Sequence, residues 1–248
     1  SPGVATFCAT VSAPPIPLAH QVVECNAPEM SDNGTPSSKP DFDARFQETL
    51  EDLLVWRRDV RRFRPDPVPK EDIKELLRMT ALSPSVGNAQ PWRFVLVNDA
   101  KRRKGVIEIF EDANADALKD YDGERAETYA SLKLSGLRDA PVHLAVYCDE
   151  GTELGLGLGR RTMPEMLAYS VVGAVTTLWL AARAHGIGLG WVSILNPAKV
   201  DAILDVPKDW KLIGYLCLGY PVEEHTDPEL ERHGWQPRVD VSSFILER

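Results

Sequence analysis

The sequence has few cysteines and no pattern of the kind that holds a structural metal. Cys8, Cys25, Cys148 and Cys217 are not spaced as C-x-x-C, and no histidine lies at metal-ligand spacing from any of them. Cys148 and Cys217 lie in apolar, strand-like runs, so we expect buried free thiols there. This cysteine usage is typical of a reducing compartment, and we expect a cytoplasmic protein without a metal site.

Positive charge is also in short supply. The chain has 28 Lys and Arg against 37 Asp and Glu, a formal net charge of -9. This balance argues against a general nucleic-acid binder and against docking on anionic membranes. A few well-placed arginines can still form a local site for an anionic ligand.

Long hydrophobic runs are almost absent. The one candidate, residues 166–182, contains a serine, a glycine and two threonines, and it is shorter than the roughly 20 residues of a membrane span. We interpret it as a buried helix at the centre of a homodimer. Residues 1–29 lack a basic n-region and a continuous apolar h-region, so no signal peptide is expected.

The composition and the hydrophobic periodicity of the chain predict one α+β domain. Residues 1–40 are rich in Pro, Ser, Ala and Asn and predict a disordered extension, within which Met30 is a candidate for the natural start. The domain, residues 41–248, is expected to hold a mixed central sheet wrapped by helices. Periodicity, prolines and glycines predict helices near residues 46–58, 69–83, 100–118, 164–185 and 197–204, and strands near 92–97, 142–148, 188–194 and 211–220.

Two segments could bind a polar, anionic ligand. Residues 57–62 read R-R-D-V-R-R after the first expected helix. They are either a solvated helix end or an anion clamp, since a guanidinium can donate two parallel hydrogen bonds to phosphate. Residues 83–92 read S-P-S-V-G-N-A-Q-P-W. Their backbone amides could bind a heterocycle, or they form an ordinary helix-to-strand turn.

Two glycine patterns, G-L-G-L-G at 155–159 and G-I-G-L-G at 186–190, are similar to a dinucleotide fingerprint. Such a loop must follow a strand and open a helix. The second pattern leaves a helix and enters a strand, and the first lacks a preceding strand. We therefore predict no NAD(P)H site.

Taken in order, these segments over roughly residues 44–240 resemble the nitroreductase-like flavoprotein superfamily. Within it they are most similar to the 5,6-dimethylbenzimidazole synthase branch. That closer similarity rests on R-R-D-V-R at 57–61, on G-E-R and S-L-K-L in the segment 121–137, and on G-W-V-S at 190–193. The branch has bulkier apolar residues where this chain has Asn88-Ala89, and an acidic residue where it has Leu167-Ala168.

The resemblance implies a homodimer with FMN at its interface and a lid over the reacting flavin at about 121–137. It implies cleavage of reduced FMN by dioxygen to 5,6-dimethylbenzimidazole, the lower ligand of cobalamin, with a separate flavin reductase supplying the reduced FMN. Asp59 would be the base near the ribityl carbon, kept ionised by its arginine neighbours. Ser193 would place its hydroxyl near flavin N5. The implied FMN contacts are Arg57, Arg58, Val60, Arg61, Pro84, Ser85, Gly87, Asn88, Gln90, Ser193, Gly219 and Arg238.

Other interpretations remain open. Asp59 could simply pair with an arginine, and Ser193 could be an ordinary strand-end hydroxyl. The chain could be an FMN-dependent nitroreductase or dehalogenase acting on a small aromatic substrate. In that case Glu124, Tyr129 and Lys133 would hold a zwitterionic ligand, as in the related iodotyrosine deiodinase. A non-enzymatic flavin carrier is the third alternative.

Overall fold

The computed structural model describes residues 40–131 and 136–248. The predicted extension and part of the predicted lid, residues 132–135, lie outside the described residues. The helices are α1 (Ala44–Trp56), α2 (Lys70–Thr80), α3 (Ala100–Leu118), α4 (Gly123–Ser131), α5 (Gly136–Asp139), α6 (Met166–Ala184), α7 (Pro197–Leu204) and α8 (Glu229–Arg232), with 3-10 turns η1 (Val86–Asn88), η2 (Leu154–Gly157) and η3 (Val241–Phe244).

Local capping explains why two helices begin where the sequence predicts. The side chain of Asp99 accepts a hydrogen bond from the backbone of Arg102 at 2.8 Å, which fixes the start of α3. Asn196 caps α7 in the same way, through Lys199 at 3.1 Å, and Pro197 is the first residue of that helix. The start of α6 is two residues later than expected, at Met166.

The sheet consists of β1 (Trp92–Leu96), β2 (Val142–Asp149), β3 (Gly188–Val192) and β4 (Trp210–Gly219) in the order β1-β2-β4-β3. All three pairings are antiparallel. The prediction of a mixed sheet is therefore wrong for these strands. After β1 and after β3, the connection returns to the sheet at the same end where the strand finished. The next strand, β2 or β4, therefore runs in the opposite direction. The isolated bridge between Asp59 and Leu189 is parallel.

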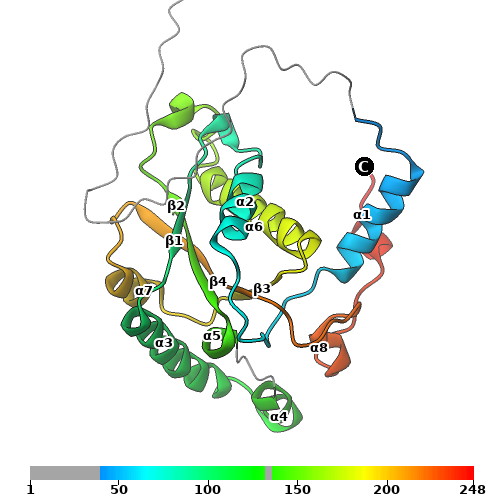
Figure 1. Ribbon diagram of the computed structural model, residues 1–248, viewed down its shortest axis with the longest axis vertical. Helices are drawn as coiled ribbons and strands as arrows, with labels where there is room; N and C mark the ends of the chain where they lie inside the picture. The colour runs from blue at the N-terminus through cyan, green and yellow to red at the C-terminus, as the bar shows by residue number, and fades with distance from the viewer. Residues whose placement is uncertain (1–39, 132–135) are drawn as a thin grey trace, which may run out of the picture. The chain divides into compact units, whose positions relative to one another are not determined.

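Both faces of the sheet are covered (Figure 1). Alternate residues of the central strands enter two separate cores, because successive side chains of a strand point to opposite faces. Leu144 and Val146 of β2 pack with α2 and α6, whereas Ala145 and Tyr147 pack with α3 and α7. The expected buried free thiols are confirmed: Cys148 faces the first core and Cys217 the second.

Helix α6 is long and apolar enough to cross a membrane by length and composition alone. Eight of its residues are buried, including Val171, Ala174 and Leu178, which pack on the sheet and on α2. This half-buried arrangement makes α6 a core element of the fold. Its opposite face leaves Tyr169 and Val172 exposed.

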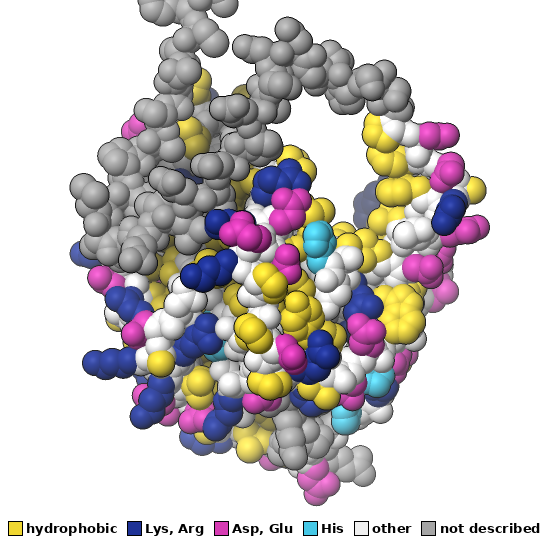
Figure 2. Space-filling model, in the orientation of Figure 1, with side chains coloured by type: hydrophobic (Ala, Val, Ile, Leu, Met, Phe, Trp, Pro, Cys, Tyr) yellow, Lys and Arg dark blue, Asp and Glu magenta, His cyan; other side chains and the backbone are white. Residues whose placement is uncertain are grey.

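Helix α1 has no buried residue. Its large apolar side chains are exposed instead, and Figure 2 shows apolar surface along this helix. The periodicity that predicts the helix is confirmed, but nothing in the described part of this chain covers that periodic face. The exposed residues are Phe46, Leu50, Leu54, Val55 and Trp56.

Candidate functional site

The segment after α1 is held against the edge of β3. The backbone N–H of Val60 donates to the carbonyl of Leu189 at 3.0 Å. The backbone N–H of Trp191 donates to Oδ1 of Asp59 at 2.9 Å. These two bonds fix the Asp59 carboxyl at the edge of the sheet, beside β3, although Asp59 is far from β3 in sequence.

The glycines of β3 make this approach possible. A Cβ on Gly190 would lie 2.2 Å from the carbonyl oxygen of Val60, and a Cβ on Gly188 would lie 2.8 Å from Val60 Cγ2. The glycine pattern therefore serves close packing of two backbones, which agrees with the rejection of a dinucleotide loop. Gly186 has a positive φ of 70° just after α6, the conformation of a left-handed helix cap.

Asp59 and Ser193 lie on the wall of one cavity of about 140 Å³. Ser193 follows β3 and is exposed at the rim of that cavity. The structure thus brings together the two residues predicted to be catalytic. Arg61, Phe110, Gly136, Leu137, Trp191 and Cys217 are among the other lining residues.

The pKa of Asp59 shifts in the direction opposite to the prediction. Burial raises the pKa of its carboxyl, and this effect exceeds the opposing effects of the Trp191 N–H and of Arg61; Glu229 raises the pKa further. The expectation that neighbouring arginines would dominate is wrong because desolvation of a carboxylate costs more than these partners return. A raised pKa makes Asp59 a stronger base than an ordinary aspartate.

Arg57, Arg58 and Arg238 lie near one another and form an arginine cluster, and Arg57 also interacts with the Asp59 carboxyl. Arg57 lies 4.8 Å above the ring of Trp179, whose Nε1 donates to the carbonyl of Arg58 at 3.1 Å. Burial lowers the pKa of Arg57 and of Arg58, and the nearby charge of Arg238 lowers both further. Arg58 binds the carbonyl of Val55 at the end of α1, but its Nε is buried without a hydrogen-bond partner among the described residues. A bound anion would reduce the repulsion between these arginines and would accept a hydrogen bond from Nε of Arg58.

Arg61 is placed differently from the other predicted phosphate ligands. Its Nε lies 3.3 Å from Oδ2 of Asp59 and 3.4 Å from Oε2 of Glu229. The side chain is largely buried and lines the cavity. Its main contacts are therefore carboxylates, not the three-arginine cluster.

The predicted heterocycle-binding loop is not part of the wall of the cavity that Asp59 and Ser193 line. Residues 84–90 include η1, where the Val86 N–H donates to Oγ of Ser170 at 3.0 Å. Asn88 and Gln90 have positive φ values of 56° and 45°, and both are exposed. Left-handed backbone at non-glycine residues is strained and is often found at binding sites. Ser85, Pro84 and Gly87 complete the loop, and Gly87 packs tightly on the carbonyl of Leu158.

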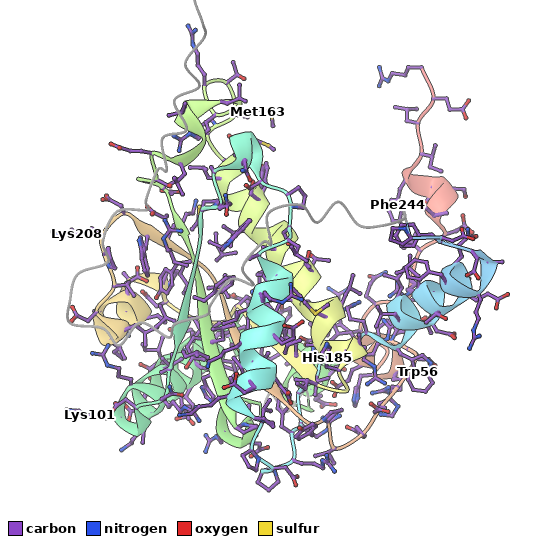
Figure 3. All side chains as sticks on the ribbon, turned by 45° about the horizontal axis from the view of Figure 1, so that its top comes forward. Trp56, Lys101, Met163, His185, Lys208 and Phe244 are labelled. Carbon is purple, nitrogen blue, oxygen red and sulfur yellow. The ribbon has the colours of Figure 1, made fainter. Side chains whose placement is uncertain are left out.

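Within one chain this loop and the arginine cluster contact different ends of α6. The loop contacts Ser170, whereas Arg58 contacts Trp179. At 1.5 Å per residue these two contacts are roughly 14 Å apart along the helix. Figure 3 shows Met163 and His185 at opposite ends of α6.

Some predicted positions have a packing role. A Cβ on Gly219 would lie 2.6 Å from Pro141 Cδ and 3.2 Å from Phe63 Cδ1, so close packing explains this glycine. Ala89 and Leu167, where the sequence departs from the synthase branch, are buried in the core. Neither departure changes a side chain that lines the cavity.

The deiodinase-like ligand set receives no support from Tyr129. Its hydroxyl donates to Oδ1 of Asn114 at 2.8 Å, and its ring stacks on Tyr121 beside Trp235. Lys133 lies outside the described residues. Sequence reasoning missed Trp235 and Glu229, because an acid-rich tail without a spacing motif gives no signal for them.

Comparison with known proteins agrees with this geometry. Residues 54–220 match the model of the Nitroreductase family. A 5,6-dimethylbenzimidazole synthase of Rhodospirillum rubrum is 56% identical over 199 residues, covering 80% of this chain and 94% of that protein. A second one, of Rhodobacter capsulatus, is 45% identical over 198 residues, covering 80% and 96%.

A solved structure gives the same result for the fold. Iodotyrosine deiodinase bound to FMN and 3-iodo-L-tyrosine superimposes with a TM-score of 0.63 at 26% identity, covering 80% of this chain and 97% of that one. The family match and the two similar synthases cover nearly all of the described domain. The chain therefore belongs to the nitroreductase family, and within that family to the 5,6-dimethylbenzimidazole synthases.

Proposed function

We propose that this chain uses dioxygen to cleave reduced FMN to 5,6-dimethylbenzimidazole, in the cavity that Asp59 and Ser193 share. The observation that carries the proposal is that Asp59 and Ser193 line one cavity, with the Asp59 carboxyl held by the Trp191 N–H and by Arg61. When bound, reduced FMN supplies the ring and the ribityl carbon of the product, and dioxygen supplies the oxidant.

The residues present fit a phosphorylated flavin. Arg57, Arg58 and Arg238 would hold the phosphate dianion, because its negative charge offsets their mutual repulsion. It would also accept a hydrogen bond from Nε of Arg58, which is buried without a partner among the described residues. Arg61 would meet the polar chain where the cavity wall continues to Asp59. Val60 contributes by fixing the backbone between them.

Asp59 would take a proton from the ribityl carbon that becomes part of the product. Its Oδ1 is fixed by the Trp191 N–H and its Oδ2 faces Arg61, so the carboxylate has one orientation toward the cavity. Ser193, at the rim, would donate its hydroxyl hydrogen bond near flavin N5. Gly136 and Leu137 line the same cavity, which supports the proposal that the segment 121–137 covers the reacting flavin and excludes bulk water.

A homodimer would complete the site. Residues 40–131 and 136–248 of one chain leave apolar side chains of α1 and α6 exposed, and exposed apolar patches of this kind mark interfaces. The loop 84–90 is far from the arginine cluster along α6. A two-fold partner would bring its own loop to this cluster, so each flavin would contact both subunits.

Mixed dimers would test this shared site. Asp59→Asn removes the base, and a loop variant combining Asn88→Gly with Gln90→Gly removes two side chains while glycine tolerates the positive φ. We expect both homodimers to be inactive and the mixed dimer to regain activity, since one of its two sites contains no substitution. Product assays after subunit exchange measure this. No recovery in verified mixed dimers would show that each site lies within one chain.

Removing a phosphate ligand should weaken flavin binding. We expect Arg58→Ala to cost about 2 kcal/mol, the scale for losing a hydrogen bond to a charged group. Quenching of flavin fluorescence in a titration measures the affinity. Arg138→Ala is the matched control, because Arg138 is an exposed arginine paired with Glu111. Equal affinity of wild type, Arg57→Ala, Arg58→Ala and Arg238→Ala would contradict the phosphate site.

The activity itself is tested by mixing flavin-free protein with reduced FMN in air. We expect 5,6-dimethylbenzimidazole to be detected by chromatography. If FMNH2 is oxidised and no 5,6-dimethylbenzimidazole forms, the proposal fails and an FMN-dependent reductase becomes the better assignment.

A further inference from the structure

Glu229, the first residue of α8, interacts with the proposed base and is largely shielded from solvent, although it lies far from that base in sequence. Only 10% of its side chain is exposed, compared with 42% for Glu223 and 44% for Asp227 nearby. Its Oε1 accepts from Nη1 of Arg62 at 3.1 Å, across 167 residues of chain. The segment that carries it follows β4 (Figure 1).

The other oxygen of Glu229 reaches the arginine that contacts Asp59. Arg61 Nε lies 3.4 Å from Glu229 Oε2 and 3.3 Å from Asp59 Oδ2. One N–H therefore faces two carboxylates at nearly equal distances and cannot satisfy both fully. Glu229 thereby helps to hold Arg61 in place. The positive charge of Arg61 is then shared between two carboxylates, so it stabilises the Asp59 carboxylate less.

The consequence concerns the strength of the base. An arginine bound only to Asp59 would stabilise the carboxylate and make it a weaker base. Glu229 opposes this both by sharing Arg61 and by adding a negative charge nearby. The other groups that face Asp59 are the Trp191 N–H, the Arg57 guanidinium and the protonated thiol of Cys217, whose pKa burial raises to about 12.

We propose that Glu229 is a positioning residue for Asp59, which holds Arg61 between two carboxylates so that the base keeps both its orientation and its strength. The inference rests on the proposed function for its catalytic consequence. Its electrostatic part concerns only this chain's own residues and can be measured without flavin.

The first test measures the titration of the Asp59 carboxyl in flavin-free protein. The protein is labelled with 13C at the aspartate carboxyls, and the Asp59 signal is assigned by its loss in Asp59→Asn. In Glu229→Gln the midpoint of the Asp59 titration should move to lower pH by about half a unit or more. Glu223→Gln is the matched control, since Glu223 also pairs with Arg62 but is far more exposed to solvent than Glu229. An unmoved midpoint in Glu229→Gln would overturn the inference.

The second test measures product against pH. In Glu229→Gln the acid limb of 5,6-dimethylbenzimidazole yield should move in the same direction, and the yield at neutral pH should fall roughly 10-fold as the base loses its position. Glu223→Gln should match wild type. A Glu229→Gln profile equal to wild type would also overturn the inference, whereas a wild type without product would overturn the proposed function.

If Glu229→Gln melts too low to assay, Glu229→Asp keeps the charge and shortens the side chain by one methylene. The inference then predicts a reduced yield with the acid limb unmoved, because position is lost and charge is retained. A wild-type yield from Glu229→Asp would overturn it.

Discussion

Asp59→Asn is expected to lower the formation of 5,6-dimethylbenzimidazole by about 100-fold or more, the usual loss when a general base is removed. Flavin binding should survive, because the arginine cluster is intact and asparagine can still accept the Trp191 N–H through Oδ1. Oxidation of FMNH2 by dioxygen should also continue. The measurement is product formed per FMNH2 oxidised, with bound flavin quantified in both proteins.

Asp201→Asn is the matched control for this substitution. Asp201 is a second carboxyl whose pKa burial raises, but it lies beside Tyr147 and away from the cavity. Its removal should leave the yield unchanged. In wild type the yield should fall as pH drops through an Asp59 pKa above the ordinary aspartate value, since only the ionised form accepts the proton. A wild-type yield from Asp59→Asn would remove this residue from the mechanism.

Gly190→Ala should be nearly as damaging, although it adds one methyl group and no charge. The new Cβ would lie 2.2 Å from the Val60 carbonyl oxygen, a separation that requires the backbone to move. Moving residues 59–61 would break the bond from Val60 to Leu189 and the bond from Trp191 to Asp59. We expect a loss of product of about 100-fold and a destabilisation of about 1–3 kcal/mol, the usual cost of overpacking.

Gly188→Ala provides the comparison on the same strand. Its Cβ would meet a methyl group of Val60 at 2.8 Å, and a side chain can yield where a backbone carbonyl cannot. The expected order is a mild loss in Gly188→Ala and a severe loss in Gly190→Ala, measured by product yield and thermal melting. Full activity in Gly190→Ala would show that the approach of segment 59–61 to β3 does not position the base.

Much of the fold can be predicted from the sequence because its signals are local. The starts of α3 and α7 follow from Asp99, Asn196 and Pro197, which act within one helical turn. The antiparallel direction of the strands could not be predicted, since strand direction depends on where each connection re-enters the sheet. A cytoplasmic location and the disorder of residues 1–40 remain predictions.

By itself, the sequence determined the family, the positions of most elements and two of the segments that line the cavity, around Asp59 and Ser193. Motif order and capping residues carry this information, and both depend on neighbours in the chain. The tertiary structure alone decided the sign of the Asp59 pKa shift, the contact of Arg61 with Glu229 and the distance between loop 84–90 and the arginine cluster. These depend on burial and on contacts between residues far apart in sequence, because desolvation and ion pairing follow distance in space.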